Sequence, residues 1–316
     1  MHPGRHLVLA GAFLAGLALN GMAQMPVAPS PVETVIVTAH AKGPVVWHAT
    51  KQGADVAILG IVQPLPDDFA WNAKPFAAIL SSARLVLLPP RIQMGLFSGA
   101  WFYLTKSDLL HPPQGRTLWD ILDSNVAAEL ARVCDVLHEP KDRYSDNAPI
   151  PAAMRLGSDY RHVAFLTTHE PEDAIRTMAR AQHVTVRTIA TYDMIPSGED
   201  LLNLPPAMTG TCIDAEIRDI DFQRVHASAA ANAWATGDVA SVLANWSPSQ
   251  FYACLVRLSP HATQIDARAI DDTVQAIEAA IAGGGRTVAV IDIGILLRKD
   301  GVLARLKGAG VSITCP

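Results

Sequence analysis

Residues 45–60 read VVWHATKQGADVAILG, and this stretch decides the fold. Residues 45–48 and 54–59 are two short runs rich in apolar and β-branched side chains, which favour β-strands. Between them, Lys51-Gln52-Gly53 forms a short loop with a glycine, which favours a tight turn between antiparallel strands. The stretch therefore predicts a β-hairpin whose second strand ends at Gly60.

Residues 61–88 predict a loop, a helix and a buried strand, in that order. Pro64 and Pro66 enforce an extended loop, and Asp67 or Asp68 can cap a helix that runs to about residue 82. Residues 85–88, LVLL, are wholly apolar, as expected for a strand in the middle of a sheet.

The middle of the chain is mainly helical by its apolar periodicity, and its end returns to a β-α-β pattern. Helices are expected at 118–138, 152–156, 171–182, 221–235, 239–245, 248–258 and 267–282, and a strand at 184–189. The last elements are a strand at 287–293, a helix at 299–307 and a strand at 311–314. The pattern predicts an α/β fold: a single domain with a β-sheet built from N- and C-terminal strands and a mainly helical middle insertion.

Composition excludes two classes of protein. Of the 316 residues, 50% are hydrophobic and 17% are charged, which is typical of a globular chain and not of a disordered one. The net charge is −5 and no block of Lys and Arg occurs, so a nucleic acid is not an expected partner.

The first 23 residues have the features of a cleavable secretory signal peptide. Arg5 provides a basic start, and residues 7–18 form an uninterrupted run of apolar and small side chains. Gly21 and Ala23 are the small residues that a signal peptidase reads, so cleavage is expected before Gln24. A membrane anchor is the alternative, but the run is shorter than the roughly 20 residues that cross a bilayer.

The rest of the chain is expected to consist of a Pro-rich spacer, residues 24–32, and one domain, residues 33–316. A β-branched segment at 33–38 predicts the first strand of this domain. No later segment is long and apolar enough to span a membrane. We therefore expect a periplasmic or secreted protein, exported by a bacterial signal peptide.

The chain contains four cysteines, which tend to form disulfides in an oxidising compartment. We predict a disulfide between Cys212 and Cys254, because these residues flank a helical segment, 221–245, that could fold back on itself. Cys134 and Cys315 lie too far apart in sequence for us to predict a disulfide between them. Buried free thiols are the alternative for any of these residues.

Several stretches of the chain resemble the TraB/GumN family, the group that includes the TIKI metalloproteases. Residues 47–90 follow the family layout: a tryptophan, a hairpin, a strand ending in glycine, a G-x-x-H motif, L-P, a helix, and a strand with an acidic residue. Residues 300–313, DGVLARLKGAGVSI, look like the family's C-terminal helix and strand, which follow a second G-x-x-H motif. Residues 234–238, WATGD, resemble its W-x-x-G-D step between two helices. The resemblance implies a TIKI-like fold.

The resemblance also implies a divalent metal held by the two histidines and the acidic residue, but this chain departs from the pattern at all three positions. The first motif is Gly60-Ile61-Val62-Gln63, with glutamine in the histidine position. The second aligns with Asp292-Ile293-Gly294-Ile295, with isoleucine in that position. The acidic position falls in the apolar Leu87-Leu88-Pro89, and we assign it to Leu88.

These replacements predict that no metal and no cofactor is bound. A metal ligand must offer a lone pair, so Leu88 and Ile295 cannot serve and the amide of Gln63 is weak. Gly60 and Gly294 still end or interrupt their strands as the family pattern requires. We therefore expect Gln63, Leu88 and Ile295 to meet in the fold although the metal site is lost.

Two functions from different classes remain open. The first is a non-catalytic protein that acts by binding an unknown small ligand or protein partner. The second is a metal-dependent hydrolase or peptidase that recruits substitute ligands such as His48, His111 or Asp292. The sequence favours the first, because it contains no H-E-x-x-H pair, no G-x-S-x-G elbow and no phosphate-binding glycine loop.

Overall fold

The hairpin forms as the sequence predicts. The computed structural model describes residues 43–315, so the expected signal peptide, spacer and strand at 33–38 lie outside the described residues. Strand β1 (Val46–Lys51) pairs antiparallel with β2 (Ala54–Ile61), and Lys51 lies opposite Ala54. The two loop residues between them have φ angles of 52° and 82°, which the glycine at the second position adopts without strain.

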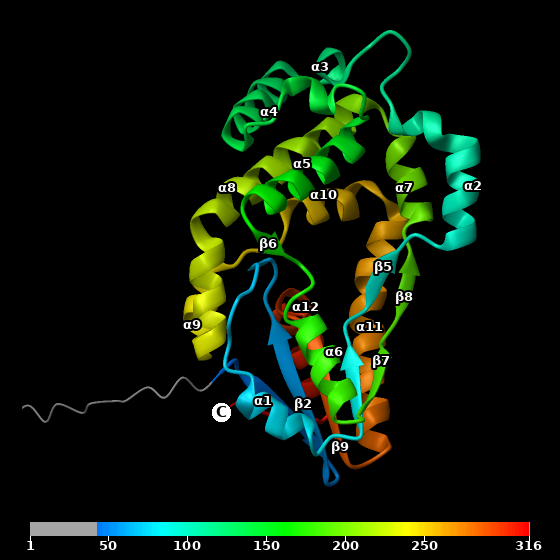
Figure 1. Ribbon diagram of the computed structural model, residues 1–316. Helices are drawn as coiled ribbons and strands as arrows, with labels where there is room; N and C mark the ends of the chain where they lie inside the picture. Colours follow the sequence, from blue (N-terminus) through cyan, green and yellow to red (C-terminus); the bar gives the residue numbers. More distant parts are fainter. Residues whose placement is uncertain (1–42, 316) are drawn as a thin grey trace, which may run out of the picture. The chain divides into compact units, whose positions relative to one another are not determined.

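The hairpin is part of a six-stranded mixed sheet (Figure 1). Its strand order is β10-β1-β2-β9-β4-β7, where the further strands are β4 (Leu85–Leu88), β7 (Thr185–Thr188), β9 (Arg286–Asp292) and β10 (Ser312–Thr314). Strands β2, β9, β4 and β7 run parallel, and β9 lies between β2 and β4. The sheet is thus built from N- and C-terminal strands, with one strand from the middle of the chain at its edge.

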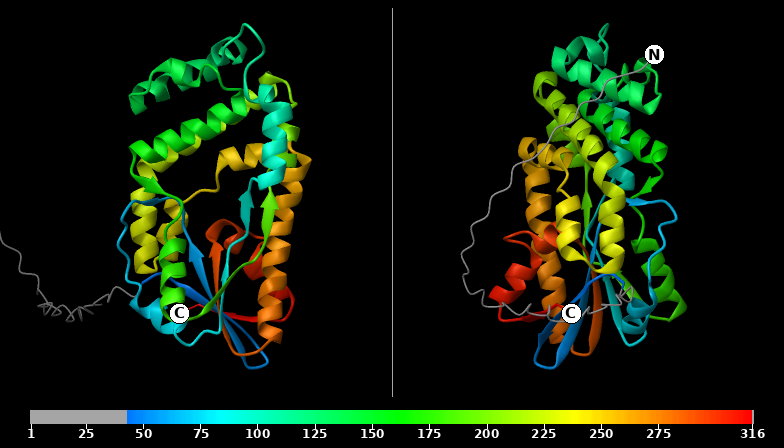
Figure 2. Two further views of the ribbon diagram at one scale, coloured as in Figure 1. Left: turned by 45° about the vertical axis from the view of Figure 1, so that its right-hand side comes forward. Right: turned by 90° about the vertical axis from the view of Figure 1, so that its left-hand side faces the viewer.

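Alternating side chains of the sheet form two hydrophobic layers. On one face, Leu59 and Leu88 pack against α1 (Lys74–Leu80), α6 (Glu172–Ala181) and the last turns of the long helix α8 (Pro206–Thr236). On the other face, Ile58 and Leu87 pack against α11 (Pro260–Ala282) and α13 (Val302–Gly308). Figure 2 shows α6 and α11 on opposite sides of the sheet.

The helical middle insertion lies beyond the carboxyl ends of the parallel strands (Figure 1). Its own core joins α4, α5 and the first half of α8. The remaining helices of the described chain are α2 (Leu96–Lys106), α3 (Leu118–Ile121), α4 (Ser124–Leu137), α5 (Pro149–Val163), α7 (Ile195–Leu202), α9 (Val239–Asn245), α10 (Gln250–Leu258) and α12 (Ile293–Leu297), with single 3₁₀ turns at Ser107–Leu110 and Lys141–Tyr144. Two short strand pairs connect the helical insertion to the sheet. Strand β3 (Leu65–Pro66) pairs with β6 (Leu166–Thr167), and β5 (Arg91–Gln93) pairs with β8 (Thr191–Asp193).

Several predicted helix boundaries are wrong. Helix α5 spans Pro149–Val163 where a helix was expected only at 152–156, and α11 begins at Pro260 and not at residue 267. The helix expected from Asp67 or Asp68 begins only at Lys74, because Asp68 adopts a left-handed φ of 57° and the Asp67 N–H donates to Phe165 O at 2.7 Å. The single helix expected at 118–138 is divided into α3 and α4. Leu122 is extended between them, and the Asp123 carboxylate caps α4 by accepting the Asn125 N–H.

Helix α8 is about twice as long as the helix expected at 221–235, since it begins at Pro206. Its first half buries residues on two sides, so no single polar face marks it in the sequence. Ile213 and Ile217 pack with α4 and α5, and Cys212 and Ala215 pack with α10. The sequence analysis predicts no helix at the positions of α2, α7 and α12.

The predicted disulfide between Cys212 and Cys254 is present, with the two Cα atoms 5.5 Å apart. The reasoning behind it needs correction, because Cys212 lies inside α8 and does not precede a separate helical hairpin. The bridge joins the first half of α8 to α10. Cys134 is a buried free thiol and Cys315 an exposed one. In residues 43–315, no helix combines the length and the apolar character needed to cross a bilayer.

Candidate functional site

A cavity of about 530 Å³ opens where the parallel strands end. The carboxyl ends of parallel strands meet at one edge of a sheet, which is the usual place for a binding site in such folds. Here β2 continues into Val62 and Gln63, β4 into Pro89 and Pro90, and β9 into α12. Side chains of α8, α10 and α11 close the other sides. We call this space the carboxyl-edge cavity.

Two of the three replaced positions line this cavity. Gln63 and Ile295 are both in its wall, together with Asp292. Leu88 is not in the wall, because it is fully buried in the hydrophobic layer one residue before Pro89. The structure therefore brings these strand ends to one edge but keeps Leu88 inside the core.

The two glycines of the motifs are required by close packing. A Cβ atom on Gly60 would lie 3.0 Å from the Trp47 ring and from Leu296. A Cβ atom on Gly294 would lie 2.8 Å from the Trp246 ring. Both positions thus have a structural reason to be glycine that needs no metal site.

Gln63 is fixed by a hydrogen bond and does not point its donor into open space. Its side-chain nitrogen donates to the backbone carbonyl of Thr168, which follows β6. The loop after β2 is thereby tied to the loop after β6. The remaining group of the side chain is a neutral carbonyl oxygen.

Asp292 is the acidic residue at the end of β9. Its carboxylate caps α12, because Oδ1 accepts the Gly294 N–H at 2.7 Å. Burial raises the pKa of this carboxyl, while hydrogen bonds from Gly294 and Ile295 act against that shift.

Further charged groups line the cavity, and the sequence analysis did not single them out. The carboxylate of Asp219 on α8 accepts the Ser249 hydroxyl at 2.7 Å and the backbone N–H groups of Gln250 and Phe251 at 2.9 Å, so it anchors the start of α10. Asp266 on α11 forms an ion pair with Arg298 at 3.0 Å. These partners are 30 or more residues apart, so no local motif marks them.

Aromatic side chains make much of the remaining wall. Phe222, Trp246, Tyr192 and Tyr252 all line the cavity. Burial, and next the nearby Asp266, raises the pKa of Tyr252 to about 12, so its hydroxyl stays protonated at neutral pH.

This wall does not fit the divalent metal that the resemblance implies. Leu88 and Ile295 offer no lone pair, and Gln63 offers only an amide oxygen. Asp292 is the one carboxylate at the replaced motifs, and it already accepts backbone N–H groups. Within residues 43–315, no group of three or more His, Cys, Asp or Glu side chains is placed to hold a metal ion.

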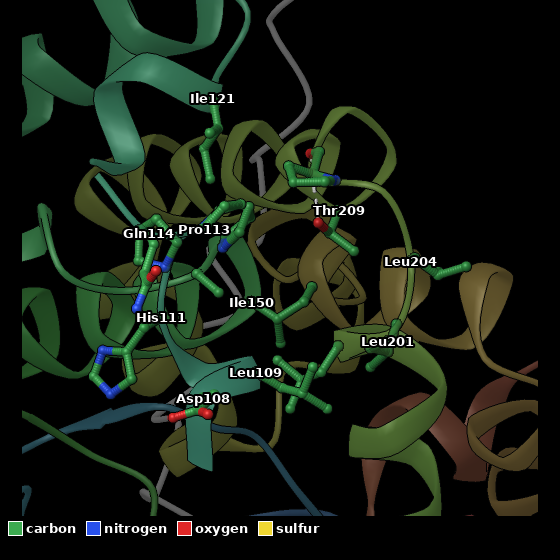
Figure 3. A pocket seen from close by; sticks show the side chains of 15 residues that line it. Asp108, Leu109, His111, Pro113, Gln114, Ile121, Ile150, Leu201, Leu204 and Thr209 are labelled. Carbon is green, nitrogen blue, oxygen red and sulfur yellow. Dashed lines mark hydrogen bonds between the residues drawn. The ribbon is translucent and has the colours of Figure 1, made fainter. Parts of the chain in front are cut away.

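The proposed substitute ligands do not meet. His48 on β1 bonds Asp55 at 2.9 Å and lines a small cavity of about 120 Å³. His111 bonds the carbonyl of Asp146 at 2.8 Å and lines a third cavity of about 580 Å³ in the helical insertion. Figure 3 shows its ring pointing away from Ile150 in that cavity. Only Asp292 lies at the carboxyl edge, so the set His48, His111 and Asp292 forms no common site.

Comparison with known proteins supports the family resemblance. The sequence pattern of the TraB/PrgY/gumN family matches residues 45–315, which is nearly the whole of the described chain. No curated protein and no solved structure matches the chain. Because the family match spans the hairpin, the helical insertion and the C-terminal β-α-β pattern, the chain belongs to the TraB/PrgY/gumN family.

Proposed function

We propose that this protein is an exported TraB/PrgY/gumN family member that acts by binding a ligand in the carboxyl-edge cavity and does not carry out metal-dependent hydrolysis. One observation carries the proposal. The cavity lies where strands β2, β4 and β9 end, and its wall presents Gln63 and Ile295 at the positions where the family resemblance implies two histidines. A catalytic zinc ion, which activates water as a Lewis acid, is held by three protein ligands. Ile295 supplies no ligand atom, and Gln63 supplies only the weakly binding oxygen of an amide.

The lost acidic residue supports the proposal independently. Leu88 is fully buried among apolar side chains of the sheet layer, where an ionised carboxylate without a cation would be costly. Leucine removes that cost, so the sheet packs without a bound ion. A cavity of about 530 Å³ with an apolar and aromatic wall and without these ligands is suited to binding and not to metal-dependent hydrolysis.

Elemental analysis of the protein, purified without a chelator, tests the proposal. We expect less than stoichiometric manganese, zinc and cobalt. Stoichiometric metal that is lost in the variants Gln63→Ala or Asp292→Asn would overturn the proposal and favour a hydrolase. Gln114→Ala is the matched control, because Gln114 is exposed at a different cavity.

The alternative of a hydrolase with substitute ligands has no observation in its favour, since His48, His111 and Asp292 line three different cavities. The same elemental analysis decides between the two functions.

Export belongs to the proposal as well. The Cys212–Cys254 disulfide is compatible with an oxidising compartment, and the first 23 residues have signal-peptide composition. N-terminal sequencing of the protein recovered from the periplasm or medium tests it. We expect the mature chain to begin at or near Gln24, and a mature chain that retains Met1 would contradict the prediction.

A further inference from the structure

The wall of the carboxyl-edge cavity carries three carboxyl side chains, and each of them contacts protein groups. Asp219 is bound by the first residues of α10, Asp266 pairs with Arg298, and Asp292 caps α12. Arg298 is the only basic side chain among the described residues of the wall, and it pairs with both Asp266 and Asp300. The wall therefore offers an anion no free cation.

Asp219 accepts three hydrogen bonds at the start of α10 but, like Asp292, has no cationic partner in the described part of the chain. Asp292 is the less occupied of the two, because its carboxylate accepts backbone N–H groups of α12 alone. None of the ion pairs formed among residues 43–315 includes it. A carboxylate has about four acceptor positions, and the hydrogen bonds to α12 use only part of this capacity. Burial without a cation is also the reason that its pKa is raised.

Gln223 on α8 lines this cavity and a second one. Its side-chain oxygen is buried and accepts no hydrogen bond within the described chain. Because this oxygen has almost no exposed surface, a ligand in the cavity does not contact it directly. Gln223 belongs to the same wall as Phe222 and Trp246, whose rings can cover an apolar group or face a cation.

We propose that the carboxyl-edge cavity binds an organic cation, with an aromatic or aliphatic body against the rings of Phe222 and Trp246 and an ammonium group paired with Asp292. This inference rests on the proposed binding function and names the class of ligand. The cavity has the volume of a small-molecule site, with apolar and aromatic walls that bury the body of the ligand. The ammonium supplies the missing charge partner of Asp292 and N–H donors for the free acceptor positions of that carboxylate.

Three probes that share an indole ring but differ in charge separate the effect of the ligand's charge on affinity from the effect of its shape. Tryptamine carries an ammonium group, indole-3-ethanol a neutral hydroxyl and indole-3-propionate a carboxylate. Calorimetric titration of all three probes at one pH, pH 8, measures the affinities. We expect tryptamine to bind about tenfold or more tightly than indole-3-ethanol, because a charge-assisted hydrogen bond is worth more than a neutral one. Indole-3-propionate should bind most weakly.

The variant Asp292→Asn removes the charge and retains the helix cap, since asparagine is an equally good N-cap residue. We expect it to weaken tryptamine binding about tenfold or more and to leave indole-3-ethanol unchanged. The control Asp135→Asn makes the same charge change at an exposed position of α4 and should leave all three affinities unchanged.

Each contrary result has its own meaning. No binding of tryptamine, equal or tighter binding of either analogue, or an unchanged affinity in Asp292→Asn overturns the organic-cation inference. Stoichiometric metal in the same preparation, lost in Asp292→Asn, overturns the proposed function itself. A metal-free protein that prefers the neutral or the anionic probe overturns the inference alone.

Discussion

The Trp234 indole N–H donates to the Gly60 carbonyl at 2.7 Å, and both residues are buried. Gly60 lies near the end of β2, whereas Trp234 lies in the last turn of α8, 174 residues later in the chain. The Trp234 ring also packs against Trp71 with a centroid distance of 5.3 Å. The bond therefore joins the first family motif to the helical insertion and holds α8 beside the carboxyl-edge cavity.

Replacing Trp234 with phenylalanine should destabilise the protein by about 1–3 kcal/mol, because the Gly60 carbonyl loses its side-chain donor in a buried position. Urea unfolding measures this change. The matched control is Trp119→Phe, since the partly exposed Trp119 indole N–H donates to the Lys141 carbonyl at 3.2 Å and to the Ser145 hydroxyl at 3.1 Å. We expect the control substitution to lower the free energy of unfolding by a smaller amount. An equal loss of stability in both variants would contradict the prediction.

Glu216 should make the protein less stable as the pH rises. Burial, and next the nearby Asp219, raises the pKa of Glu216 to about 7 against the opposing effect of Arg161. The folded state then holds a proton that the unfolded state releases at its ordinary pKa of 4.5. The free energy of unfolding should therefore fall between about pH 4.5 and pH 7, by about 3 kcal/mol in total.

The variant Glu216→Gln tests this dependence. Glutamine stays neutral, so we expect a gain of about 1–3 kcal/mol at pH 8 and little change at pH 4, by urea unfolding at both values. Glu278→Gln is the control, because Glu278 is exposed on α11. A gain at pH 8 that is the same for both variants, or absent for Glu216→Gln, would show that Glu216 is ionised at little cost.

The Cys212–Cys254 disulfide should stabilise the protein by about 4 kcal/mol in the chain-entropy model, since it closes a loop with a sequence separation of 42. Reduction before urea unfolding should therefore lower the midpoint. The double variant Cys212→Ser and Cys254→Ser should show the lower midpoint without reductant and no further shift with it. An unchanged urea midpoint of unfolding after reduction of the native protein would contradict the prediction.

The two free thiols should react at very different rates. Burial raises the pKa of Cys134 to about 11, so little of the reactive thiolate is present at pH 8, and the side chain is fully buried. Cys315 is exposed. A thiol reagent should modify one cysteine in the native protein and a second only after unfolding. In Cys315→Ser no fast reaction should remain, and a fast reaction in this variant would contradict the burial of Cys134.

Local sequence patterns were sufficient where an element depends on its own residues. The hairpin of β1 and β2 follows from two β-branched runs and a two-residue loop that ends in glycine. Helix α9 has the predicted bounds, since Asp238 caps it and the chain turns at Gly237 with a φ of 77°. The same patterns gave wrong ends where a long-range contact decides, as at Asp67, whose N–H is bound by Phe165.

The sequence by itself determined the family and the α/β class. It also predicts the loss of metal ligands at Gln63, Leu88 and Ile295, because residue identity alone states which side chains have lone pairs. Only the tertiary structure decided that Gln63 and Ile295 share a cavity with Asp292 while Leu88 is buried in the core. The same holds for Asp219, whose partners at the start of α10 come from a different helix. Hydrogen bonds and ion pairs between distant segments depend on how the helices pack on the sheet, and no local pattern in the chain encodes that packing.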